Sequence, residues 1–295
     1  MNITIVEVGP RDGLQNEPTH LPLDTKVELV QRLAATGARR IEAGSFVHPK
    51  AVPQMADTDD LCARIERDGQ IMYTALVLNE RGFERARAAN VDQVNFAFAA
   101  TETFNQRNQR ASPQESVDVF KQIVGLAKAA GMRCSMTVGA AFGCPFEGEV
   151  PPERVVDFAM QAAEAGADEI VLADTIGVAV PTQVTQLLRA VRSALGDDLP
   201  LGVHLHNTRN TGYANAYAAL EAGATLFDAA VGGTGGCPFA PRATGNIATE
   251  DLVYMFERMG VPTGIDLDRM IETAQWLEGQ LGKPLPGQLM KAGRF

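Results

Sequence analysis

The sequence predicts a (β/α)8 barrel, the TIM-barrel class of α/β fold, with extra helices at the C-terminal end of the chain. Three observations predict it. Short β-rich runs alternate with amphipathic helical patterns, the helical patterns repeatedly end in Ala-Gly-Ala or a close variant, and eight β-rich runs can be counted. This alternation indicates parallel βαβ units, and 295 residues are enough for one such barrel.

The eight expected strands are separated by short turns from the helical patterns before them. Ala165-Gly166-Ala167 leads into one strand and Ala222-Gly223-Ala224 into another. Glycine just past a helix supplies the left-handed cap that turns the chain toward the next strand. The expected strands are residues 3–8, 40–43, 71–77, 93–96, 134–138, 169–172, 201–205 and 226–229.

Amphipathic helical patterns lie between and after these strands, and several have proline in the first turn, where its missing N–H costs nothing. The patterns expected to be helices are residues 23–36, 113–130, 151–165, 181–194, 210–222, 247–259 and 267–281. The last two follow the eighth strand. No linker divides the chain, so we expect one domain over residues 1–295, with the barrel at about 1–260 and a helical extension at about 261–295. The first strand is not followed by G-x-G-x-x-G, which argues against an open dinucleotide-binding sheet.

Composition excludes several partners. The formal net charge is −10 and the isoelectric point is about 5.0, so the chain as a whole repels nucleic acid. It shows neither a basic segment followed by an apolar one at its start nor a stretch of about 18 apolar residues, so we expect no secretion signal and no membrane span. The four cysteines are widely spaced and form no C-x-x-C pair. These observations predict a cytoplasmic protein without a disulfide framework.

Polar and reactive residues follow several of the expected strands. Barrel enzymes place their chemistry at the C-terminal ends of the strands, so residues far apart in the sequence are expected to meet there. The residues in these positions are Arg11 and Asp12, Glu42, Asp174, His204 and His206, a Gly-rich segment that contains Cys237, and Asn246.

His204 and His206 are separated by one residue, and alternate residues of a strand point to the same face. Two buried, hydrogen-bonded histidines would be the ordinary interpretation of such a pair. Here, however, the chain has only four histidines, and Asp12 at the same rim would complete a set of two imidazoles and one carboxylate. Mixed nitrogen and oxygen ligands suit Mg²⁺, Mn²⁺ or Co²⁺ better than a closed structural zinc site. We therefore expect a divalent cation here, and expect His20 and His48 on the surface.

The other rim residues each allow two interpretations. Arg11 beside Asp12 is either a solvated turn or a guanidinium aimed into a dry pocket, where it would stabilise an enolate oxygen. Cys237 lies in a Gly-rich segment. It is either a small packing residue or a thiol that transfers a proton. Glu42 is a candidate counter-anion for Arg11, whereas Cys62, Cys134 and Cys144 are expected to be structural.

Five motifs resemble 3-hydroxy-3-methylglutaryl-CoA (HMG-CoA) lyase, a family of the DRE-TIM metallolyase superfamily. The similarity extends over nearly the whole chain, and the Gly-Gly-Cys-Pro segment is specific to the lyase branch. The motifs are Arg11-Asp12-Gly13-Leu14-Gln15-Asn16, Ser45-Phe46-Val47, Asp174-Thr175-Ile176-Gly177, His204-Leu205-His206, and Gly235-Gly236-Cys237-Pro238-Phe239-Ala240 with Gly245-Asn246.

The resemblance implies a role for each matched residue. Asp12, His204, His206 and Asn246 would bind Mg²⁺ or Mn²⁺. Arg11 would polarise the thioester carbonyl, Cys237 would protonate the enolate, and Asp174 and Glu42 would be active-site polar residues. Gln15 would contact the acyl group, and Asn108 would contact CoA. The implied reaction is the retro-Claisen cleavage of HMG-CoA, or of a closely related 3-hydroxyacyl-CoA, to acetyl-CoA and acetoacetate or the corresponding keto acid, as in leucine degradation. A homodimer is expected because the C-terminal helices offer additional surface.

The pattern departs from the lyases directly after the histidine pair. Where they usually have Asp, Thr and Tyr, this chain has Asn207, Thr208 and Arg209. We expect this change to alter the charge beside the acyl group, so another acyl-CoA such as citramalyl-CoA is an alternative substrate. A Claisen-condensing acyltransferase of the isopropylmalate or citramalate synthase type is a second alternative, against which Leu14 and Cys237 argue. A non-catalytic barrel scaffold would be expected to lack at least one polar rim residue, and none is missing.

Overall fold

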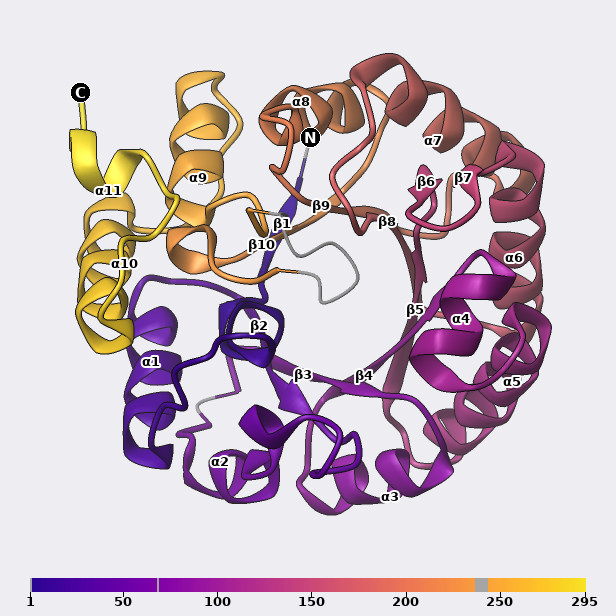
Figure 1. Cartoon of the computed structure of the whole chain (residues 1–295), viewed down its shortest axis with the longest axis horizontal. Coiled ribbons are helices and arrows are strands. Elements are labelled where there is room, and N and C mark those ends of the chain that lie inside the picture. The colour runs from indigo at the N-terminus through magenta and orange to yellow at the C-terminus, as the bar shows by residue number, and fades with distance from the viewer. Residues whose placement is uncertain (1, 68, 237–243) are drawn as a thin grey trace.

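The computed structural model describes residues 2–67, 69–236 and 244–295. Eight parallel strands close into a barrel in the order β1-β10-β9-β8-β5-β4-β3-β2, which confirms the predicted fold class (Figure 1). The strands are β1 (Thr4–Glu7), β2 (Arg40–Ser45), β3 (Met72–Val77), β4 (Gln93–Ala99), β5 (Arg133–Gly139), β8 (Glu169–Asp174), β9 (Leu201–Leu205) and β10 (Leu226–Ala229). Each contains one of the runs expected to be a strand or lies within it.

Helices surround the barrel and bury their apolar faces against it (Figure 1). They are α1 (Leu23–Ala35), α2 (Thr58–Arg64), α3 (Glu80–Ala88), α5 (Pro113–Ala129), α6 (Pro152–Ala165), α7 (Pro181–Leu195), α8 (Gly212–Glu221) and α9 (Thr249–Arg258). α10 (Leu267–Leu281) packs against both α1 and α9, with the Arg32 guanidinium 4.7 Å from the centre of the Trp276 ring, and is followed by α11 (Leu289–Ala292). The predicted C-terminal helices are therefore present and cover the first helix of the barrel.

Local chemistry sets the ends of these helices. Ser112 and Glu115 form a capping box at the start of α5, in which the Ser112 hydroxyl accepts from the Glu115 N–H at 3.1 Å and the Glu115 carboxylate accepts from the Ser112 N–H at 2.6 Å. Pro113 occupies the first helical position. α6 ends at Gly166, whose φ of +91° is the left-handed conformation that glycine adopts without a steric penalty. The Ala-Gly-Ala signal thus marks the end of this helix, as predicted.

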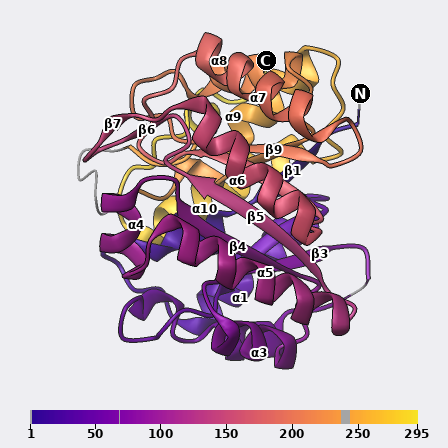
Figure 2. The same cartoon turned by 90° about the vertical axis from the view of Figure 1, so that its right-hand side faces the viewer.

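Two features at the C-terminal end of the barrel were not predicted. Helix α4 (Glu102–Gln109) and a hairpin formed by β6 (Gly143–Cys144) and β7 (Gly148–Glu149) lie at the same end of the barrel (Figure 2). Both follow strands that were predicted, β4 and β5, so they are elaborations of the loops that carry the chemistry of a barrel.

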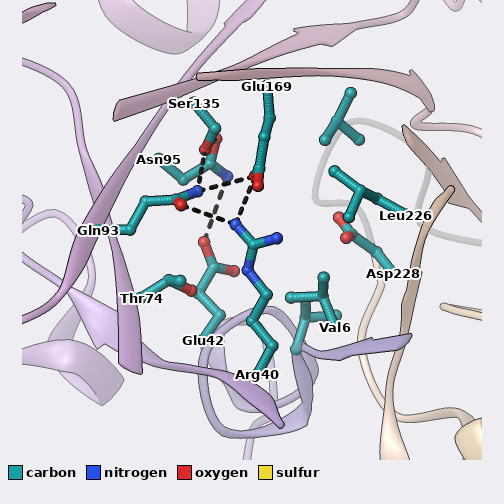
Figure 3. Close-up of a pocket in the computed structure, with 12 residues that line it drawn as sticks. Val6, Arg40, Glu42, Thr74, Gln93, Asn95, Ser135, Glu169, Leu226 and Asp228 are labelled. Carbon is teal, nitrogen blue, oxygen red and sulfur yellow. Dashed lines mark hydrogen bonds and ion pairs between the residues drawn. The ribbon is translucent and has the colours of Figure 1, made fainter. Parts of the chain in front are cut away.

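The barrel interior is polar near the N-terminal ends of its strands. Arg40 on β2 forms a buried ion pair with Glu169 on β8 and donates to Gln93 at 2.7 Å, and Gln93 donates to Ser135 at 2.9 Å (Figure 3). A small cavity of about 20 Å³ lies beside this network. No helix in the described ranges is long and apolar enough to cross a lipid bilayer.

Candidate active site

A single turn of π-helix, Gly9–Gly13, carries Arg11 and Asp12 at the C-terminal end of β1. The carbonyl of Val8 accepts from the backbone N–H groups of Arg11, Asp12 and Gly13 at 2.8–3.1 Å. Gly13 is required here, because a Cβ atom on it would lie 2.3 Å from the Thr234 hydroxyl oxygen. The turn thus brings the first rim loop into direct contact with the Gly-rich segment after β10.

His204 and His206 both face a cavity at the C-terminal end of the barrel, as predicted from their spacing. Their Nε2 atoms lie 3.2 Å apart, and the Asp12 carboxylate is 3.8 Å from one and 4.0 Å from the other. The ligand atoms of these three residues all lie within 4.8 Å of one another. Both histidines are buried, whereas His20 and His48 are exposed. The structure therefore assembles the predicted group of two imidazoles and one carboxylate.

Asn246 lies against the same group. Its Nδ2 atom donates to the Asp12 carboxylate at 2.8 Å and to the Thr234 carbonyl at 2.9 Å. Its Oδ1 atom is buried and has no hydrogen-bond partner in the part of the chain that the structure describes. A buried acceptor without a partner is costly, and a cation would satisfy it. Two imidazole nitrogens, a carboxylate and a free amide oxygen are together a donor set that fits a divalent cation.

The protonation states of two members of the group, Asp12 and His206, favour cation binding. Burial raises the pKa of Asp12, but the charge of Arg11, aided by His204 and His206, outweighs it and lowers this pKa to about 2. Burial and the neighbouring His204 lower the pKa of His206 to about 4. At neutral pH Asp12 is thus an anion and His206 a neutral imidazole, which are the forms that bind metals.

Arg11 is buried and held by two carboxylates. Its Nε atom donates to Glu42 at 2.5 Å and its Nη1 atom to Asp12 at 2.7 Å. Glu42 also accepts from Asn95 at 3.3 Å, and its pKa is raised because burial outweighs the charge of Arg11. The predicted contact between Glu42 and Arg11 is therefore present. In the described part of the chain Nη2 of Arg11 makes no hydrogen bond, so it remains available to the cavity.

A cavity of about 460 Å³ connects this polar group to the outer wall of the rim. Arg11, Asp12, His204 and His206 line one end, together with Gln15, whose Oε1 atom is buried without a partner among the described residues. Apolar side chains also line the cavity, among them Val52, Leu76, Leu78, Phe98 and Phe104. Arg107, Asn108 and Gln109 of α4 line the outer wall, where the Arg107 guanidinium lies 4.2 Å from the centre of the Phe146 ring.

Three residues singled out in the sequence do not line this cavity. Asp174 does not line this cavity, because its two carboxylate oxygens accept the backbone N–H groups of Val178 and Ala179, each at 2.9 Å. Arg209 donates to the carbonyls of Ile176 and Gly177, and Asn207 accepts from the N–H of Gly212 at the start of α8. Asn207 and Arg209 thus direct hydrogen bonds to loop backbone and do not line the cavity, and the expected change of charge beside the acyl group stays a prediction.

Two further residues, Cys237 and Asp228, bear on the candidate site. Cys237, predicted to transfer a proton, lies outside the described residues; Gly236 immediately before it lines the cavity. Sequence reasoning missed Asp228 on β10, whose Oδ2 atom lies 3.1 Å from Nδ1 of His204. An acidic residue within the otherwise apolar run Leu226-Phe227-Asp228-Ala229 was the available signal.

The chain folds into a closed parallel barrel, with a candidate cation site and a cavity at the C-terminal ends of its strands. These features are typical of metal-dependent TIM-barrel enzymes. Comparison with known proteins shows similarity to one family over nearly the whole chain. The HMGL-like family model matches residues 2–277. The chain is 50% identical to (R)-citramalyl-CoA lyase of Chloroflexus aurantiacus, with 99% of this chain and 95% of that protein covered. It is 41% identical to hydroxymethylglutaryl-CoA lyase of Bacillus subtilis, with 97% and 95% covered.

Solved structures agree with this. An HMG-CoA lyase from Acinetobacter baumannii, in complex with coenzyme A and 3-methylmalate, has a TM-score of 0.95 at 44% identity, covering 99% of this chain and 95% of that one. The protein belongs to the HMGL-like family, within the DRE-TIM metallolyases, and is a carbon–carbon lyase. The predicted family and class of enzyme are both confirmed.

Proposed function

We propose that the protein cleaves HMG-CoA, or a closely related 3-hydroxyacyl-CoA, by a retro-Claisen reaction that depends on Mg²⁺ or Mn²⁺. The observation that carries the proposal is the convergence of Asp12, His204, His206 and Arg11 in the wall of the cavity of about 460 Å³. A cation bound there would lower the pKa of the substrate hydroxyl. Asp12, His204, His206 and Asn246 would hold it.

The roles of the remaining residues rest on their positions and, for Cys237, on its match to the lyase motif. The 3-hydroxyl group would lose its proton to a base, its oxygen would form the carbonyl of the keto acid, and the bond between C2 and C3 would break. The electron pair of that bond would form the thioester enolate, and C2 would then take up a proton. The free N–H of Arg11 would donate to the enolate oxygen, with Glu42 fixing the guanidinium. Cys237 would deliver the proton to C2. Asp174 would act by shaping the loop after β8 rather than by touching the substrate.

The volume and lining of the cavity support an acyl-CoA substrate. Gln15 with its free buried oxygen lies at the polar end, where the acyl group would be. Asn108 and Arg107 lie at the outer wall, where Arg107 adds positive charge to a chain whose net charge is −10. Phosphate groups of CoA would be attracted to this wall.

Citramalyl-CoA is the second candidate substrate, favoured by the 50% identity to a citramalyl-CoA lyase. The two thioesters differ by one methylene group, so both would place a hydroxyl and a carboxylate near the cation. A single methylene changes specificity by about 10–200-fold. HMG-CoA would yield acetoacetate and citramalyl-CoA would yield pyruvate, each with acetyl-CoA.

The experiment compares kcat/KM of the purified protein for HMG-CoA and for both enantiomers of citramalyl-CoA, with Mg²⁺ or Mn²⁺, and measures both acetyl-CoA and the keto acid. We expect turnover of at least one thioester and its loss on treatment with a chelator. His204→Ala should lose both metal and turnover, whereas Cys237→Ser should keep the metal and lose turnover by orders of magnitude. Absence of acetyl-CoA with all three thioesters would refute the proposed substrates.

We propose that the enzyme is a cytoplasmic homodimer that serves leucine degradation if HMG-CoA is its substrate. Size-exclusion chromatography with light scattering tests the dimer directly.

A further inference from the structure

Asp228 lies directly beside His204 in the barrel wall. β10 pairs with β9 so that Asp228 is opposite His204, and with β1 so that Asp228 is opposite Val6. Its Oδ2 atom lies 3.1 Å from Nδ1 of His204, and both residues are buried. Because strands on both sides fix its backbone, the carboxylate is presented to the imidazole by the rigid part of the fold and not by a loop.

This contact decides which nitrogen of His204 is free. A carboxylate is an acceptor, so Nδ1 of His204 carries the proton and donates it. Nε2 of the same ring, on the opposite side, then turns toward Nε2 of His206 at 3.2 Å and toward Asp12 at 3.8 Å. Asp228 thereby aims His204 at the point where the other candidate ligands meet.

The two histidines differ in this respect. Nδ1 of His206 is buried and has no hydrogen-bond partner in the described part of the chain. Among the described residues, His204 alone of the two has its Nδ1 atom held by a second side chain. Histidine ligands of metals commonly donate their other ring N–H to a carboxylate or carbonyl, which fixes the ring and raises its basicity.

Asp228 also forms part of the wall of the small interior cavity below the site. Figure 3 shows its carboxylate facing the space beside Arg40, and the Nε atom of Arg40 is buried without a partner among the described residues. The same carboxylate borders the cavity of about 460 Å³ as well. Asp228 thus lies between the candidate site and the polar interior network, without belonging to the group of candidate ligands.

We propose that Asp228 is a positioning residue that holds His204 with its proton on Nδ1 and so prepares Nε2 to bind the cation. The inference rests on the proposed cation site at Asp12, His204 and His206. It predicts that Asp228 sets the affinity for the cation before any substrate is present.

The test measures the Kd for Mn²⁺ alone by isothermal titration, in the wild-type protein, Asp228→Ala and Asp228→Asn. Loss of such a supporting carboxylate weakens metal binding by about 10–100-fold, and we expect a change of this size for Asp228→Ala. Asp228→Asn should weaken binding less, because its amide oxygen still accepts from Nδ1–H. ¹H–¹⁵N spectra of the Mg²⁺-loaded protein should show the proton on Nδ1 of His204 in the wild type and in Asp228→Asn.

Thr74→Val is the matched control. Thr74 is buried in the wall of the same small cavity and has no hydrogen bond to either histidine, so its variant should bind Mn²⁺ as the wild type does. If the wild-type protein binds Mn²⁺ and both Asp228 variants bind it equally well, the positioning role is refuted while the cation site stands. If the wild-type protein binds no Mn²⁺, the proposed site itself fails. Should Asp228→Ala not fold, the nearly isosteric Asp228→Asn and the spectra still decide the question.

Discussion

At the scale of single residues, Arg11 shows how one side chain is held for chemistry. Its planar guanidinium contacts Glu42 through Nε and Asp12 through Nη1, on two different edges. A lysine ammonium has one charged nitrogen and no such fork, so it cannot keep both contacts and still offer a fixed donor to the cavity. The arrangement therefore depends on arginine and not only on positive charge.

Arg11→Lys tests this dependence. Loss of a well-placed donor to a developing oxyanion lowers kcat by about 10²–10³-fold, and we expect a loss of this order with the Kd for Mn²⁺ near its wild-type value. Steady-state kinetics and metal titration measure the two quantities. Arg209→Lys is the control, because Arg209 donates only to backbone carbonyls outside the cavity and should retain turnover. Wild-type kcat in Arg11→Lys would exclude an essential role for the guanidinium.

At the scale of elements, two buried glutamates connect the rim loops. Glu7 at the end of β1 accepts from the backbone N–H groups of Gly9 and Val231, at 2.7 and 3.0 Å, and from the hydroxyl of Thr249 at 2.6 Å. Glu250 of α9 accepts from the N–H of Gly232 at 3.0 Å. Burial raises the pKa of Glu7 to about 7 and that of Glu250 to about 8, although these hydrogen bonds act against it. Together they fix the start of the Gly-rich segment after β10.

Glu250→Gln should make the protein less sensitive to pH. Between a pH of about 4.5 and about 8 the folded protein keeps the proton on Glu250 while the unfolded chain has lost it, so wild-type stability falls as pH rises through this range. A neutral glutamine removes that loss. We expect the variant to gain stability relative to the wild type, by up to about 4 kcal/mol at pH 8 and by little at pH 5.

Urea unfolding at several pH values measures this difference. Glu221→Gln, which changes an exposed carboxylate at the end of α8, is the control and should leave the pH dependence of the wild type unchanged. A variant whose stability changes with pH in parallel with the wild type would show that Glu250 does not hold a proton in the folded state.

At the scale of the whole molecule, the barrel could be predicted because its signals are repeated. Short β-rich runs recur along the chain, and Gly166 and Gly223 mark turns where a helix gives way to a strand. The helices that were missed lack such signals. α2 has only seven residues, and α3 and α4 are mostly polar, so packing against the barrel and not local pattern determines them. The boundary between barrel and extension near residue 260 stays a prediction.

The candidate site likewise contains residues that could be predicted from the sequence and residues that could not. Asp12, His204 and His206 could be predicted to converge because strand spacing and the geometry of a barrel rim place them together. The neighbouring Asn207 and Arg209 could not be placed, because their side chains turn to loop backbone that no sequence period describes. Asp228 escaped notice since its partner lies on the next strand, and pairing of these two residues depends on the register of the closed barrel.

Arg40 and Glu169 connect opposite sides of this barrel, since β2 and β8 lie four strands apart around it. Breaking a buried ion pair on one side leaves an uncompensated charge and costs about 3–5 kcal/mol. We expect Arg40→Leu to lower the free energy of unfolding by about 3 kcal/mol, the lower end of that range, because Arg133 still donates to Glu169 at 3.0 Å.

The double variant Arg40→Leu/Glu169→Leu should recover part of this stability, because it buries no unpaired charge. Urea unfolding of the two single variants and the double variant gives the coupling energy between the residues directly. Additive losses would mean that the pair is not coupled. Recovery would mean that the ion pair joins β2 to β8 across the polar interior. The polar network next to Asp228 and the cation site would then contribute to the stability of the whole barrel through its charges.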